Sequence, residues 1–249
     1  MFCSPLEQFS IIKILSLNIL FLDFSLTSIS IFGIISLIFV YCFIRFVSEK
    51  NYTIFRPWRF IAYSLLKLVL GLILDNVGKV GLKYMNLILS VFLLILMLNY
   101  ISLVPYSFTL TARLGVCLTL SILVWTGATI LALYLNGLNF ISMFLPNNTP
   151  NLLVVPFILI ETLGYMIRPI SLGVRLVANL AAGHLLLSLG SSFIYFLLIN
   201  DTIWLNVIAI LPLIFLIVFS YLEIAVAFIQ AYVFSLLSIS YINDSINLH

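Results

Sequence analysis

Two long apolar runs, Val154–Ile199 and Ile203–Ile242, are the features that most restrict how this chain can fold. Ionisable and amide side chains interrupt both runs or lie just beyond them: Glu161, Arg168, Arg175, Asn179 and His184, then Glu223, Gln230 and Asp244. A charge in the middle of a bilayer costs about 2.5–3.5 kcal/mol on insertion scales, so such residues usually line a pathway. The runs therefore predict membrane helices that carry a polar route for a charged species.

The composition excludes a soluble domain. The chain of 249 residues is 64% hydrophobic and 8% charged, whereas a soluble domain is about 25% charged. About five or six spans of roughly 20 residues fit into this length. The cysteines Cys3, Cys42 and Cys117 have no metal-ligand spacing. With no nucleotide-binding glycine loop and no nucleophile constellation, we expect no metal, cofactor, nucleic-acid partner or enzyme activity in this chain.

The first half of the chain divides into spans and one surface segment. We expect one all-α membrane domain over residues 1–249, with a first span at 29–47 and a helical hairpin at 84–135. Residues 58–80 mix apolar positions with Arg59, Lys67 and Asp75, which suits an amphipathic helix at the membrane surface. Seven of the eleven basic residues fall between Arg45 and Lys83. Because basic loops favour the side of synthesis, the N-terminus is expected on the outside.

The last third allows two topologies. Val154–Ile199 would measure about 69 Å as one helix, against a hydrocarbon core of about 30 Å. The run either breaks into two spans near Pro169 or forms one steeply tilted helix, and Ile203–Leu248 poses the same question at Pro212. The chain then crosses the membrane seven times or about five times.

The polar residues favour the long helices. In an antiparallel hairpin, two residues that face each other are equally far from the turn, so their numbers average to the residue number of the turn. For a hairpin over 152–248 that turns near 200–203, three pairs of polar residues have numbers that average about 203. These pairs are His184 with Glu223, Arg175 with Gln230, and Glu161 with Asp244. Three independent pairs that centre on one turn predict two single, tilted helices.

The helical phase separates the polar residues into two zones. Glu161, Arg168 and Arg175 are seven apart, so they drift by only about 20° per step, whereas His184 lies about 180° from Arg175. Histidine and glutamate can exchange protons, as a relay requires. Arginine keeps its charge, so it can block proton passage and attract a carboxylate but cannot relay protons. We interpret Arg168, beside Pro169, as a structural charge.

Several motifs identify a resemblance. The segments that carry it are 171–186 (SLGVRLVANLAAGHLL), 222–234 (LEIAVAFIQAYVF), 160–162 (IET) and 99–108 (NYISLVPYSF). In these segments, and strongly from about residue 95 to the end, the sequence resembles subunit a of the F-type ATP synthase. The histidine at 184 with a glutamate at 223 resembles the mitochondrial form, whereas many bacterial members have glycine and histidine there.

The resemblance implies a non-catalytic, multi-pass subunit in the mitochondrial inner membrane, within a large hetero-oligomer. It implies that a long tilted hairpin contacts the rotating ring of c subunits, and that a peripheral stalk, other membrane-sector subunits and lipid are further partners. Arg175 would be the essential arginine that faces the ring. Two half-channels would carry the protons. His184, Glu223, Asn179 and Gln230 match the outer half-channel, and Glu161 and Asp244 match the inner one.

Two other classes of function fit less well. A stand-alone secondary transporter usually shows internal repeats with paired broken helices, and the sequence shows none. A membrane scaffold would explain the hydrophobicity but would not explain the charged residues that share one register.

Overall fold

The computed structural model describes residues 13–15, 18–19, 22–23, 25–48, 56–104, 107–137, 140, 144, 154–199 and 203–246. Its helices are α1 (Ser28–Ser48), α2 (Arg56–Asn76), the 3₁₀ helix η2 (Gly78–Tyr84), α3 (Met85–Ser102), α4 (Leu114–Asn136), α5 (Val154–Ile199) and α6 (Ile203–Ile246). Five helical segments within these residues are long and apolar enough to cross a membrane. The expected all-α membrane class is confirmed.

Four short strands that were not predicted from the sequence precede α1. β1 (Lys13–Leu15) pairs antiparallel with β4 (Leu26–Thr27), and β2 (Asn18–Ile19) pairs antiparallel with β3 (Leu22–Asp23). Each ladder joins strands of two or three residues, too short for the alternation of side chains to show in the sequence.

Helix α2 covers most of the segment expected to lie on the membrane surface. It is not among the five membrane-length segments. Val69 and Ile73 are fully buried, whereas Lys67 and Asp75 are exposed, so the helix has one apolar and one polar face. Gly78, at φ +74°, turns the chain from α2 into η2, a backbone conformation that favours glycine.

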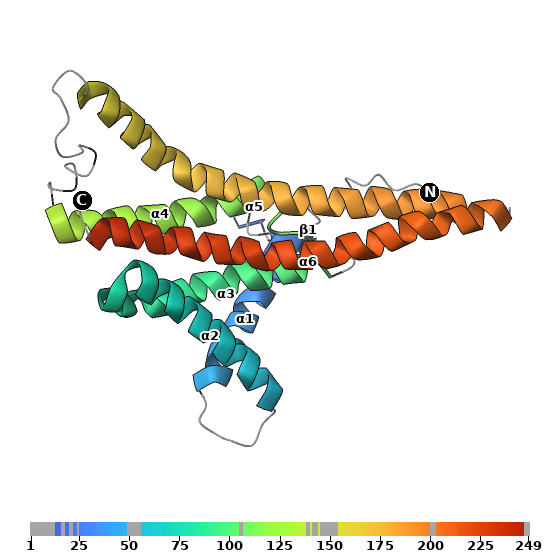
Figure 1. The fold of residues 1–249 in the computed structure, drawn as a ribbon, viewed down its shortest axis with the longest axis horizontal. Coiled ribbons are helices and arrows are strands. Elements are labelled where there is room, and N and C mark those ends of the chain that lie inside the picture. Colours follow the sequence, from blue (N-terminus) through green and yellow to red (C-terminus); the bar gives the residue numbers. More distant parts are fainter. Residues whose placement is uncertain are drawn as a thin grey trace.

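Helices α5 and α6 are each continuous, so the alternative of two broken spans per run is wrong. Pro169 and Pro212 lie inside them without ending them. Figure 1 shows the two helices antiparallel and side by side at the end of the molecule that extends beyond α3 and α4, with α5 diverging from α6 toward its own start. The predicted turn at 200–202 lies outside the described residues, as do the loop residues Pro105 and Tyr106.

The hairpin is braced along only part of its length. Buried residues of α3, such as Phe92 and Leu93, form the centre of the core, and α3 and α4 both pack against α6. The Asn99 amide of α3 donates a hydrogen bond of 3.2 Å to the Ala227 carbonyl of α6. Near the turn, Leu189 and Phe215 are more than half exposed. The other helices therefore fix the half of the hairpin far from the turn.

Candidate functional site

Arg175 lies in the middle of α5 on an exposed face. It forms no hydrogen bond or ion pair with any residue that the structure describes. Three of the exposed residues one or two turns away are small: Ser171, Ala178 and Ala182. Small side chains let another helix approach closely, so the guanidinium stands at a place where a partner helix can reach it.

Asn179 and Gln230 join the two helices one turn from Arg175. The Asn179 amide nitrogen donates to the Gln230 side-chain oxygen at 3.0 Å, and Gln230 is 5% exposed. The expected pairing of Arg175 with Gln230 is therefore wrong. Asn179 holds the glutamine oxygen between the helices, which leaves the longer arginine side chain on the exposed face.

Glu223 is buried against α5, next to the histidine that was expected to face it. A Cβ added to Gly183 would lie 2.9 Å from the Glu223 carboxyl carbon, so the carboxyl group occupies the space that this glycine leaves. Neither Glu223 oxygen has a hydrogen-bond partner among the described residues, and the same holds for the buried Nε2 of His184. The structure thus places the Glu223 carboxyl group against Gly183, the residue before His184. Glu223 and the Nε2 atom of His184 are not joined by a hydrogen bond.

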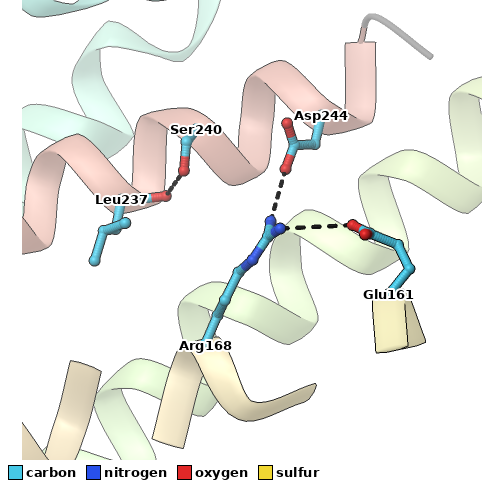
Figure 2. Close-up of polar contacts among 5 residues, drawn as sticks. All are labelled: Glu161, Arg168, Leu237, Ser240 and Asp244. Carbon is cyan, nitrogen blue, oxygen red and sulfur yellow. Dashed lines mark hydrogen bonds and ion pairs between the residues drawn. The ribbon is translucent and has the colours of Figure 1, made fainter. Parts of the chain in front are cut away.

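Glu161 and Asp244 are connected through Arg168, which was interpreted from the sequence as a structural charge. Figure 2 shows the Arg168 guanidinium between the two carboxylates. One nitrogen lies 3.3 Å from Asp244 Oδ2 and the other 3.7 Å from Glu161 Oε1. The side chains are 42%, 21% and 45% exposed for Arg168, Asp244 and Glu161. The signal was present in the sequence, because Arg168 is on the stripe that Glu161 and Arg175 define.

These residues lie at separate depths along the hairpin. From Glu161 to His184 the helical rise is about 35 Å, and from Glu223 to Asp244 it is about 31 Å. Arg175 lies between, about 14 Å from His184 and about 21 Å from Glu161 along α5. The site is therefore two polar clusters with one exposed arginine between them. No metal-binding group of three or more histidine, cysteine or acidic residues occurs in the part of the chain that the structure describes.

Residues 28–243 match the family described as ATP synthase A chain, from the start of α1 to one residue before Asp244. The chain belongs to the family of ATP synthase subunit a.

Three curated members of the family are similar over nearly the whole chain. The ATP synthase subunit a of Candida albicans is 38% identical, with all of both chains covered. That of Trichophyton rubrum is 38% identical over 99% of this chain and 97% of the relative. The plant protein from Oenothera berteroana is 36% identical over 99% and 90%.

Membership of the subunit a family, with five membrane-length helices, establishes the broad role of the chain. It is a multi-pass protein of the mitochondrial inner membrane and a proton-translocating subunit of the membrane sector. It works within a complex that contains other membrane-sector subunits. The sequence-based expectations at this level are confirmed.

Proposed function

We propose that Arg175 is the essential arginine that faces the rotating ring of c subunits, and that the two polar clusters line two proton half-channels. The observation that carries the proposal is the exposed Arg175 without a partner among the described residues, in the middle of a membrane helix. An uncompensated charge at that depth is costly, so it needs a partner that approaches from outside the chain.

A carboxylate on a neighbouring helix suits Arg175. The planar guanidinium can bind a carboxylate with two parallel hydrogen bonds, and it stays protonated throughout. The small exposed residues around it permit close helix packing. A ring carboxylate that has lost its proton would be attracted to Arg175, and a protonated one would be released.

The Glu223 and His184 cluster, with Asn179 and Gln230 beside it, fits the outer half-channel. A buried carboxylate without a hydrogen-bond donor is unfavourable unless water or a proton satisfies it. Glu223 and the Nε2 atom of His184 are in this situation within the described residues. Both groups can accept and release protons, so this cluster would pass protons to the ring.

The Glu161, Arg168 and Asp244 cluster fits the inner half-channel, at the basic side of the membrane. It lies near the start of α5 and the end of α6, and its side chains are between 21% and 45% exposed, so water would reach them from that side of the membrane. The Arg168 guanidinium contacts both carboxylates and would hold them in position to receive a proton that leaves the ring.

The separation of the clusters supplies direction to the flow. A proton that enters through one cluster would reach the other only after travelling with the ring, because Arg175 blocks the direct path. A membrane potential contributes about 2.3 kcal/mol per charge per 100 mV, enough to bias rotation. In this proposal the chain handles no nucleotide, and the peripheral stalk and other subunits hold it against the ring.

The test is Arg175→Ala in membranes that contain the assembled complex. ATP synthesis driven by a proton gradient should fall by at least about 100-fold, because a transition that depends on this charge loses more than about 2.7 kcal/mol. Passive proton leak should rise because the block is removed. Arg45→Ala, an exposed arginine at the end of α1, is the matched control and should retain synthesis. Normal synthesis in the Arg175→Ala complex would overturn the proposal.

A further inference from the structure

A cavity of about 530 Å³ lies between α3 and α4, and neither Arg175 nor any residue of the two polar clusters lines it. Its walls are faces of α3 and α4, with Phe234 and Ile242 of α6 and Leu37 and Val40 of α1 also in the lining. Leu87 and Leu123, one on each wall, are 51% and 66% exposed, so the cavity is a groove that opens on the outer surface of the helices.

We propose that this groove binds one acyl chain of an anionic phospholipid whose head group lies at Lys83. The proposal does not depend on the ring or the half-channels. In a membrane, acyl chains are the solvent of an open apolar groove, and filling it restores the dispersion contacts that its lining would otherwise lack.

The shape and lining of the groove suit an acyl chain. Its lining extends from Tyr84, the last residue of η2, to Ile95 on α3, and from Leu120 to Leu131 on α4, a helical rise of about 16 Å on each wall. Apart from Tyr84 and Ser90, the side chains that line it are apolar. A groove of this length and apolar lining accommodates a hydrocarbon chain that runs along the helices.

Gly127 keeps the groove open. A side chain added at this position would meet nothing within 4 Å, and the residue lines the groove. Small residues in membrane helices usually allow a second helix to approach closely. Here no described helix approaches Gly127, so its small size instead makes space for the occupant.

The charge at one end of the groove selects the head group. Lys83 directly precedes Tyr84, which lines that end, and Lys79 lies four residues earlier. Both lysines are exposed, and neither forms a hydrogen bond or ion pair within the described part of the chain. Tyrosine and lysine are typical of the membrane interface, and basic clusters there attract anionic lipid. The other end of the groove, at Ile95, lies within the span, so the occupant belongs to the leaflet on the basic side.

The test uses the assembled complex in phosphatidylcholine vesicles that contain phosphatidylglycerol with a photoreactive acyl chain. After illumination, the labelled peptides of this chain are mapped by mass spectrometry. We expect label on residues 84–95 and 120–131. Gly127→Leu should reduce that label by about fivefold or more, because leucine fills the groove, and Gly127→Ala should reduce it less. Gly115→Leu is the matched control, since Gly115 is also a glycine of α4 with nothing within 4 Å and does not line the groove.

The head group is tested with the same acyl chain on phosphatidylcholine. That probe should label the groove less than the anionic one, and Lys83→Gln should remove the difference. Lys13→Gln, at an exposed lysine of β1 that does not line the groove, should not remove it. Equal labelling of the wild-type complex by both probes would overturn the anionic head group. No label in the groove, or label that Gly127→Leu leaves unchanged, would overturn the binding site.

Discussion

The two polar clusters of the α5–α6 hairpin hold their ionisable side chains in opposite ways. Far from the turn, Arg168 lies between Glu161 and Asp244, and all three side chains are partly exposed. Nearer the turn, Glu223 is 5% exposed, and neither of its oxygens has a hydrogen-bond partner among the described residues. In one cluster an arginine pairs with both carboxylates, and in the other no described residue donates a hydrogen bond to the carboxylate.

This contrast distinguishes carboxylates that have a charged partner within the chain from a buried carboxylate that has none among the described residues. Partly exposed ion pairs contribute only about 0–1 kcal/mol to stability, so removing one pair from the Arg168 cluster should change the free energy of folding little. A buried carboxylate without a donor destabilises the fold unless its proton or a water molecule compensates. Under the proposed function both clusters carry protons, but Glu161 has Asp244 beside the same arginine, whereas no second carboxylate contacts Glu223 within the described part of the chain, so variants of the two clusters should differ in size of effect.

Among variants of the two clusters, Glu223→Gln should have the largest effect. The amide has the shape of the acid but cannot carry a proton, and general acid–base groups typically contribute about 100-fold or more. We expect proton-driven ATP synthesis to fall by about 100-fold while the complex remains assembled on native gels. The measurement is the synthesis rate at a fixed proton gradient.

Glu161→Gln is the matched comparison for Glu223→Gln in the paired cluster. Because Asp244 remains beside Arg168, synthesis should fall by no more than about threefold, consistent with the small contribution of exposed pairs. If the two variants reduced synthesis equally, the proposed distinction between the clusters would be wrong.

Gly183→Ala should produce the next largest effect. The added Cβ would lie 2.9 Å from the Glu223 carboxyl carbon and would displace the side chain or the helix. Overpacking of this kind costs about 1–3 kcal/mol, so we expect about a tenfold loss of synthesis. Gly164→Ala on the same helix meets nothing within 4 Å and should leave the rate unchanged. An unaffected Gly183→Ala complex would show that Glu223 is not held against the glycine.

The sequence predicted the architecture because apolar runs and helical rise are local properties. The segments 84–135 and 152–248 appear as pairs of helices with nearly the expected bounds, and α5 and α6 are single helices as the shared register indicated. The strands before α1 were missed, because ladders of two or three residues carry no periodicity.

The contacts within the hairpin were predicted only approximately, because a register argument assumes straight helices. Near the turn Gly183 contacts Glu223, and the mean of these two residue numbers is 203, as expected for a hairpin that turns there. Farther away the contacts are Asn179 with Gln230 and Arg168 with Asp244, whose centres shift progressively toward α6. Figure 1 shows α5 curving away from α6 in this direction, and Pro169 lies in that part of the helix. A proline frees the backbone to bend, but the size of the bend depends on packing that the sequence does not contain.

Arg168→Ala should reduce synthesis by only about twofold to fivefold, since the ion pairs it removes are partly exposed and contribute at most about 1 kcal/mol. Arg168→Lys keeps the charge but loses the planar fork that spans both carboxylates, and it should lie between Arg168→Ala and the wild type. The measurement is the synthesis rate alongside Arg175→Ala in the same membranes. If Arg168→Ala were as severe as Arg175→Ala, Arg168 would belong to the transport machinery and not only position Glu161 and Asp244.

The smallest expected effect concerns the amide bridge between the clusters. Interhelical hydrogen bonds in membranes are worth about 0.6 kcal/mol on average in double-mutant cycles. Asn179→Leu, Gln230→Leu and the double variant therefore form a cycle whose coupling should be about 0.6 kcal/mol, close to a threefold change in an equilibrium constant.

The measurement is the reversible loss of contact between α5 and α6, followed by a pair of spectroscopic probes as detergent is titrated. The control cycle pairs Asn179→Leu with Ser245→Ala, which is remote from the bridge and should show no coupling. A coupling near zero at Asn179 and Gln230 would mean that the bridge of 3.0 Å does not hold the helices together. The two amides would then be available to hydrogen-bond to water that carries protons past them. The polar groups without a strong partner in the chain would in that case include Asn179 and Gln230 as well as Glu223.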